Sequence, residues 1–169
     1  MLFRSVADGI GEELGFVPSA EERAALAASI ACWPPFADTV PALRQLKTRF
    51  KLGVISNIDD DLFAGSARHL EVGFSFDWLV TAQQARAYKP STRPFQLALE
   101  RIGLPREKLI HVAQSLFHDH VPAKQLGLRT VWVNRRADRP GFGATPPASA
   151  QPDLEVKTMA ELAQLAVPP

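Results

Sequence analysis

Short apolar runs alternate with helical segments along most of this chain, and that alternation restricts its fold more than any other feature. The strand-like runs occupy residues 52–57, 76–82, 109–114, 129–134 and 154–156. The helical segments occupy residues 38–50, 59–70, 91–102, 118–126 and 159–165. Strands that alternate with helices form a parallel sheet with helices on both faces. The sequence therefore predicts an α/β fold with a doubly wound parallel sheet.

The amino-terminal part follows a different pattern. Its apolar residues recur every four positions, as in an amphipathic helix, at Leu2, Val6, Ile10 and Leu14. Ser19 and Glu22 have the spacing of a capping box at the start of a second helix. The two prolines of the Trp-Pro-Pro-Phe turn at residues 33–36 then interrupt the helical pattern. We expect a helical subdomain at residues 1–32 and an α/β core at residues 33–169.

Charge and cysteine content restrict the partners and the compartment. Nineteen basic residues stand against 18 acidic ones, a net charge of +1. That balance argues against a nucleic acid or a membrane as the main partner. The single cysteine, Cys32, excludes an internal disulfide and fits a reducing compartment. The first residues lack the order of a signal peptide, so we expect a cytoplasmic protein.

Polar side chains follow three of the predicted strands. Ser56 and Asn57 end the first strand, Lys89 lies beyond the second, and residues 114–119 follow the third. Sheets of this kind bind ligands at the carboxyl ends of their strands. A lysine beside carboxylates can hold a nucleophilic aspartate ionised, and hydroxyl groups can bind a substrate carboxylate or phosphate. These residues together predict a hydrolase-like site.

Three motifs in this order resemble those of the haloacid dehalogenase (HAD) superfamily. They are Ser-Asn after a strand, Tyr-Lys-Pro before a helix, and a strand–loop–Asp element. The W-P-P-F-x-D-T turn and the V-W-V-N-R strand are similar to the type II 2-haloacid dehalogenase-like branch. The resemblance covers nearly the whole chain. It implies a Rossmann-like core with part of a helical cap in residues 1–32.

The resemblance also implies roles for single residues. The residues expected to be catalytic are Lys89, Ser115 and Asp119. Those expected near the substrate are Ser56, Asn57, Tyr88, Phe95, Gln114 and His118. In this superfamily an aspartate attacks the carbon that bears the halide, and water then hydrolyses the ester. The expected substrate is a small 2-substituted carboxylic acid.

The family's nucleophilic aspartate and the strand before it have no match in this chain. That strand would lie between the runs at residues 52–57 and 109–114, and unpaired buried backbone groups each cost about 1–3 kcal/mol. Three alternatives follow: the two strands close onto each other, another chain fills the gap, or the sequence is a fragment of a longer protein. The stability argument favours the fragment. Asp59, Asp60 and Asp61 are interpreted as helix-start residues rather than as a replacement nucleophile.

The residue at position 114, a glutamine, indicates whether the site binds a metal ion. Phosphatases of the superfamily usually have an acid at that position that helps to hold Mg²⁺, and a neutral amide is a weaker ligand for a hard cation. We therefore expect no metal and no cofactor. A site formed by His118 and His120 is the less favoured alternative, because positions two apart face different sides of a helix.

Other functions stay open at this stage. The chain is expected to be a haloacid dehalogenase-like hydrolase whose nucleophile it does not itself contain. One alternative is a truncated or inactive HAD-like domain that binds an anion or a partner, and another is a HAD-type phosphatase. A nucleotide-binding domain ranks last, because Gly-Phe-Gly at residues 141–143 opens no helix. A homodimer is one candidate assembly.

Overall fold

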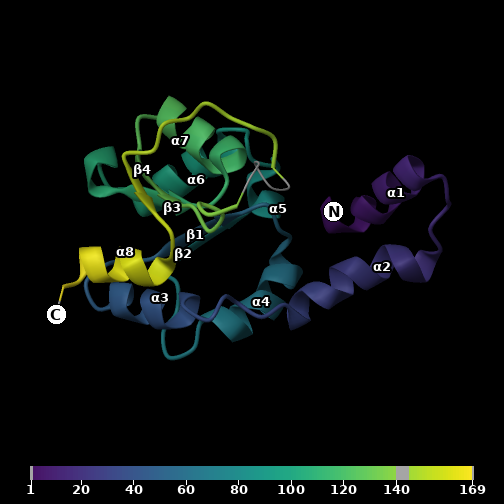
Figure 1. Cartoon of the computed structure of the whole chain (residues 1–169), viewed down its shortest axis with the longest axis horizontal. Helices are drawn as coiled ribbons and strands as arrows, with labels where there is room; N and C mark the ends of the chain where they lie inside the picture. Colours follow the sequence, from purple (N-terminus) through teal and green to yellow (C-terminus); the bar gives the residue numbers. More distant parts are fainter. Residues whose placement is uncertain (1, 140–144, 169) are drawn as a thin grey trace.

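Five described strands form the centre of the molecule, in two separate groups (Figure 1). The structure is a computed structural model that describes residues 2–139 and 145–168. β1 (Gly53–Ser56) pairs with β2 (Trp78–Thr81). β3 (Ile110–Ala113) pairs with β4 (Arg129–Val133), and β4 pairs with β5 (Leu154–Val156). Every pairing is parallel, which confirms the predicted α/β class.

Helices occupy the predicted segments with small shifts. They are α1 (Leu2–Leu14), α2 (Ala20–Ser29), α3 (Thr39–Lys47), α4 (Asp60–Leu70), α5 (Ala82–Ala85), α6 (Arg93–Ile102), α7 (Val121–Gln125) and α8 (Met159–Ala166). Three short turns are η1 (Ile30–Cys32), η2 (Arg106–Lys108) and the π-helical η3 (Leu116–His120). The helix predicted at residues 118–126 is present as two consecutive helical segments, η3 and α7. Pro122 lies in the first turn of α7, where its missing N–H is tolerated.

Helices cover both faces of the strands. α3 and α8 pack on Val131, Val133 and Val156, whereas α6 and α7 pack on the opposite face around Phe95 (Figure 1). Neighbouring residues of one strand therefore enter different cores, because side chains alternate between the two faces of a strand. This layering places the loops after the strands at one edge of the molecule, where the predicted site lies.

β1 and β3 do not pair with each other in the part of the chain that the structure describes. The alternative in which these two strands close onto each other is therefore wrong. Both groups nevertheless share their covering helices. Ile55 of β1 and Leu109, just before β3, pack against the cluster around Phe95. On the other face Leu52 packs against the cluster that contains Val131, so the two groups form two halves of one layer.

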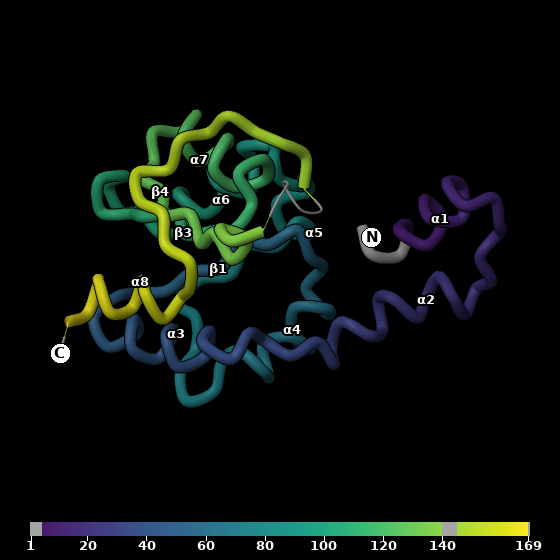
Figure 2. The backbone as a smooth tube through the Cα atoms, viewed as in Figure 1, coloured from purple at the N-terminus to yellow at the C-terminus, as the bar shows by residue number. Residues whose placement is uncertain are grey.

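The amino-terminal helices extend away from this layer. α1 and α2 pack on each other and lie at the far end of the molecule from the carboxyl terminus (Figure 2). The predicted capping box is present, because Ser19 Oγ accepts from Glu22 N at 3.2 Å while Glu22 Oε2 accepts from Ser19 N at 2.7 Å. A domain boundary between residues 32 and 33 stays a prediction. None of the described helices combines the length and apolarity needed to cross a membrane. Residues 141–143 lie outside the described residues.

Asp38 joins three parts of the core. It precedes α3, but its side chain does not cap that helix. Instead its Oδ2 accepts from Met159 N at 2.8 Å, at the start of α8, and its Oδ1 lies 3.0 Å from Arg135 Nη1. Burial would raise the pKa of Asp38, but the bonds from Arg135 and Met159 outweigh it and hold the pKa below its ordinary value. Asp38 therefore stabilises the start of α8 rather than that of α3, which it precedes.

Replacing Asp38 by asparagine is expected to lower the free energy of unfolding by about 2 kcal/mol, because hydrogen bonds to charged groups each contribute about 1.5–3 kcal/mol. Urea unfolding followed by circular dichroism measures the change. The matched control is Asp138→Asn, whose ion pair with Lys157 is 81% exposed on the aspartate side. A loss no larger than that of the control would contradict the assignment.

Candidate active site

Lys89 is held at the edge of β1 by two acceptors. Its Nζ donates to Ile55 O at 2.9 Å and to Asp119 Oδ1 at 2.7 Å. The side chain is 11% exposed, so the ammonium is largely removed from water. An ammonium has three N–H donors, and among the described residues only these two acceptors are present. One N–H therefore remains for a ligand or for another carboxylate.

Asn57 fixes the backbone of Lys89 from both sides. Its Oδ1 accepts from Lys89 N at 2.7 Å, and its Nδ2 donates to Lys89 O at 3.0 Å. These two bonds tie the loop after β2 to the end of β1. The amide of Asn57 is thus engaged by Lys89, so its effect on a substrate would pass through the position of that lysine.

Asp119 lies at the start of the helical segment after β3 and is buried, with 10% of its side chain exposed. Its Oδ1 accepts from Lys89 and also from His111 Nε2 at 3.0 Å, where the imidazole must donate because a carboxylate only accepts. Burial would raise the pKa of Asp119, but the His111 hydrogen bond and the Lys89 charge outweigh it. The pKa therefore lies below its ordinary value, and the carboxylate is ionised at neutral pH.

His111 was not predicted as a site residue. It lies on β3, and its ring meets the Phe95 ring edge-on with the centroids 5.0 Å apart. Side chains alternate along a strand, so a polar residue in an apolar run could have indicated this position. The sequence does not say which face of β3 points towards Lys89, and only the packing against α6 decides it.

Ser115 and the neighbouring histidines are engaged locally. Ser115 Oγ accepts from His118 N at 3.0 Å as the cap of η3, and it lies 3.1 Å from His118 Nδ1. His120 is fully buried, and its Nε2 donates to Ala113 O at 3.1 Å. Burial lowers the pKa of His120, so its ring is neutral. His118 and His120 thus have different partners.

The remaining predicted residues are buried to different degrees. Phe95 is completely buried, Tyr88 is 38% exposed, and Ser56 ends β1 opposite Thr81. Gln114 has an exposed side chain, while its backbone O accepts from Trp132 Nε1 at 2.8 Å. The structure thus brings Asn57, Lys89 and Asp119 into one bonded group together with His111. Direct contacts of the other residues with a substrate stay predictions.

The residues present do not fit the Mg²⁺ ion of the superfamily's phosphatases. A hard cation prefers several oxygen ligands, most of them charged. Here the carboxylate of Asp119 already binds an ammonium, and Gln114 offers only a neutral amide. Within residues 2–139 and 145–168 no group of three or more His, Cys, Asp or Glu could hold a metal ion.

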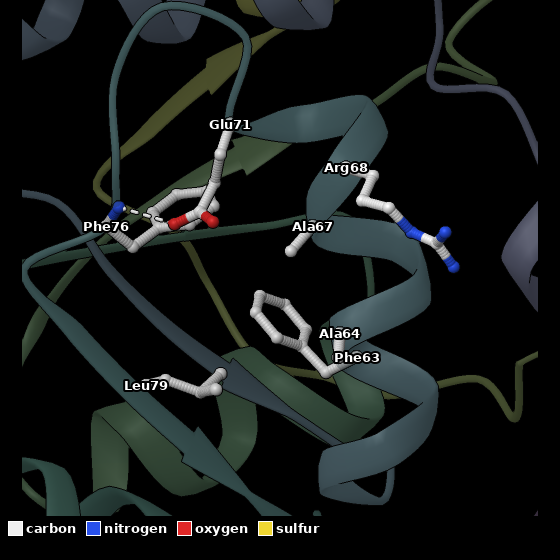
Figure 3. Close-up of a pocket in the computed structure, with 7 residues that line it drawn as sticks. All are labelled: Phe63, Ala64, Ala67, Arg68, Glu71, Phe76 and Leu79. Carbon is white, nitrogen blue, oxygen red and sulfur yellow. Dashed lines mark hydrogen bonds between the residues drawn. The ribbon is translucent and has the colours of Figure 1, made fainter.

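An open pocket of about 510 Å³ lies elsewhere, between α4 and β2. Figure 3 shows its mostly apolar lining, Phe63, Ala64, Ala67, Arg68, Glu71, Phe76 and Leu79. Glu71 is engaged by Phe76 N at 2.8 Å, and Arg68 points away from the aromatic rings (Figure 3). None of the predicted site residues lines it, so this pocket is not the candidate active site.

The sequence matches the model of the haloacid dehalogenase-like hydrolases over residues 23–133. The chain belongs to that family. The (S)-2-haloacid dehalogenase of Pseudomonas putida is 31% identical over 129 residues, which are 76% of this chain and 54% of that protein. The glyceraldehyde 3-phosphate phosphatase of Methanocaldococcus jannaschii is 31% identical over 107 residues, 62% of this chain and 46% of that protein. This HAD-like chain spans about half the length of the curated relatives it matches.

Solved structures show the HAD fold in two kinds of enzyme. An L-2-haloacid dehalogenase from Xanthobacter autotrophicus with chloropropionic acid covalently bound has a TM-score of 0.77 and 21% identity, covering 95% of this chain and 72% of that one. A HAD phosphatase from Thermococcus onnurineus has a TM-score of 0.64 and 24% identity, covering 96% and 72%. At these identities the likeness concerns the fold alone.

Proposed function

We propose that this chain is the lysine–aspartate part of a haloacid dehalogenase-like hydrolase that acts on a small 2-substituted carboxylic acid. The nucleophilic aspartate comes from outside these 169 residues. The observation that carries the proposal is the buried Lys89, held by Ile55 O and Asp119 with one N–H left over. A second carboxylate placed at that N–H would stay ionised, and hence nucleophilic, beside the ammonium.

The reaction would proceed in two displacements. A carboxylate oxygen attacks carbon 2 of the substrate, and the carbon–halogen bond breaks with its electron pair leaving on the halide. Water then attacks the acyl carbon of the resulting ester, which releases the 2-hydroxy acid and a proton and restores the carboxylate. Lys89 holds the nucleophile, while Asp119 and His111 hold Lys89. Ser56 and Gln114 are the proposed contacts for the substrate carboxylate.

Chloride release from 2-chloropropionate tests this function. The assay uses the chain extended at its amino end by an apolar strand that ends in a D-x-x-G-T motif. We expect turnover, and we expect Lys89→Met to lower kcat by about two to three orders of magnitude, because removing one electrostatic contact of this kind costs roughly 3–4 kcal/mol of the barrier. Lys157→Met, which changes an exposed lysine, is the matched control and should keep the full rate.

Two outcomes would favour other functions. Phosphate release from small phosphate esters without chloride release would assign the site to the phosphatases. Phosphatase activity is the second candidate function, because the Methanocaldococcus jannaschii relative is a phosphatase. Neither activity in a folded, extended chain would favour an inactive domain that binds an anion or a partner.

A further inference from the structure

We propose that His111 is a positioning residue of the candidate site, which fixes the plane of the Asp119 carboxylate and, through it, the direction of the remaining N–H of Lys89. The inference deepens the proposed function, and it rests on that function only for its effect on turnover. The hydrogen-bonded geometry belongs to the described residues, so it can be tested on the chain without any catalysis.

The Asp119 carboxylate uses one of its two oxygens for both donors. Oδ1 lies 2.7 Å from Lys89 Nζ and 3.0 Å from His111 Nε2. Oδ2 accepts no hydrogen bond from the residues that the structure describes, and it is not among their buried atoms that lack a partner. Oδ2 is therefore in contact with solvent, and the two donors hold the carboxylate from its other oxygen.

The second donor matters because one donor alone does not fix a carboxylate. The terminal torsion of an aspartate side chain is broad, so the carboxylate plane can turn while either oxygen accepts from the same ammonium. Two donors that reach one oxygen from different elements remove this freedom. Lys89 then has two acceptors in fixed places, Ile55 O at 2.9 Å and Asp119 Oδ1, and the tetrahedral ammonium directs its third N–H to one point.

His111 is held by the strand layer itself. It lies within β3, where it pairs in register with Thr130 of β4. Its ring meets the fully buried Phe95 ring edge-on, with the centroids 5.0 Å apart, and 13% of its side chain is exposed. Lys89 and Asp119 instead come from the segments that follow β2 and β3. A strand residue positions a group more precisely than a loop residue does, so the imidazole is the fixed point of this group.

The electrostatics of Asp119 agree with this role. Burial raises the pKa of its carboxyl, and the hydrogen bond from His111 is the largest of the contributions that lower the pKa below its ordinary value. The charge of Lys89 comes next. Among the described residues, the other titratable group beside the carboxylate is His120, whose own pKa is lowered by burial. Removing the imidazole donor should therefore raise the pKa of Asp119 even with Lys89 in place.

The titration of Asp119 in the 169-residue chain tests the inference. Carbon-13 NMR of the Asp119 carboxyl group follows its protonation in the wild type, in His111→Gln and in His111→Met. Glutamine keeps an N–H donor, whereas methionine is of similar length and lacks one. We expect His111→Met to raise the pKa of Asp119 and His111→Gln to keep it close to the wild-type value. His69→Met is the matched control and should leave the titration unchanged, because His69 is exposed and bonds Ala31 O at 2.8 Å on α4, outside the site.

A titration that is the same in the wild type and in both variants would overturn the inference and leave His111 as a packed core residue. An equal rise in both variants would overturn it too, because the size of the side chain and not its donor would then matter. Asp119→Asn tests the same contact from its other end if His111→Met does not fold. The nitrogen-15 signals of the His111 ring should then shift from their wild-type positions, and unchanged signals would overturn the inference.

Turnover by the extended chain adds a readout that a packing role would not move. His111→Met should lower kcat about ten- to a hundredfold at an unchanged KM, because a small misplacement of a positioned group has an effect of this size. His111→Gln should restore most of the rate. In a Lys89→Met chain, His111→Met should cause less than about a twofold further loss, since residues that act as a unit are not additive. A full separate loss in that chain would overturn the role.

The two experiments separate this inference from the proposed function. The expected titration without chloride release from the extended chain would keep the positioning of Asp119 and Lys89 by His111 and reject the function. Chloride release by the extended chain with an Asp119 titration that His111→Met leaves unchanged would keep the function and reject the positioning role.

Discussion

Replacing Asp119 by alanine is expected to lower the free energy of unfolding of the chain by about 3 kcal/mol, since breaking a buried ion pair from one side typically costs about 3–5 kcal/mol. The carboxylate and its partner Lys89 are 10% and 11% exposed, so the variant leaves an ammonium in the core without its counter-ion. Its Oδ1 also accepts from His111, and that donor loses its acceptor too. Urea unfolding at pH 7 measures the loss.

The pH dependence adds a second readout for the same variant. The folded pKa of Asp119 lies below its ordinary value, so its contribution is complete above the unfolded pKa of about 3.9 and disappears as the pH falls through the folded pKa. The wild type should therefore lose more stability than Asp119→Ala below pH 4. A double variant with Lys89→Met should recover part of the loss, because the unpaired ammonium is then gone. Identical pH profiles for the wild type and Asp119→Ala would contradict the assigned role.

Phe95→Ala is expected to cost about 3–5 kcal/mol of unfolding free energy, the usual range for removing a fully buried aromatic side chain. Its ring is 0% exposed and packs with Ala123 and Leu128. The same cluster carries Ile55 and Leu109, one from each half of the strand layer. The variant should therefore loosen the connection between β1 and β3 as well as create a cavity. Chemical denaturation together with hydrogen exchange of residues 53–56 and 110–113 measures both effects.

Leu165→Ala is the matched control for Phe95→Ala. Leu165 lies in α8 and is 60% exposed, so its truncation should change stability by no more than about 0.5 kcal/mol. If Phe95→Ala cost no more than this control, the cluster around Phe95 would not be the connection between the two halves.

The order of the elements follows from local patterns in the sequence. The apolar runs became β1 to β5, and the capping box at Ser19 and Glu22 starts α2 as expected. These patterns depend only on residues that lie close together in the sequence, so they can be recognised before the fold is known. The elements that were missed, α5, η1 and η2, span only three or four residues. A segment of that length cannot display a helical period.

Part of the candidate site could be predicted from the sequence, because the loops after parallel strands meet at one edge of the sheet. That rule brought Asn57, Lys89 and Asp119 together, and the structure bonds them. His111 was not predicted, because only tertiary packing decides which face of β3 contacts α6. The role of Asp38 was missed for the same reason, since α8 lies far from it in sequence but donates a backbone N–H to its carboxylate in the core.

The sequence by itself determined the α/β class, the family and the residues at the carboxyl ends of the strands, because these depend on local periodicity and short motifs. Only the tertiary structure decided that β1 and β3 remain apart, with Lys89 and Asp119 bridging the space between them. Strand pairing depends on which backbones meet across a layer, and that is set by the helices that cover both halves. The edges of β1 and β3 that no described strand covers are therefore a property of the folded chain.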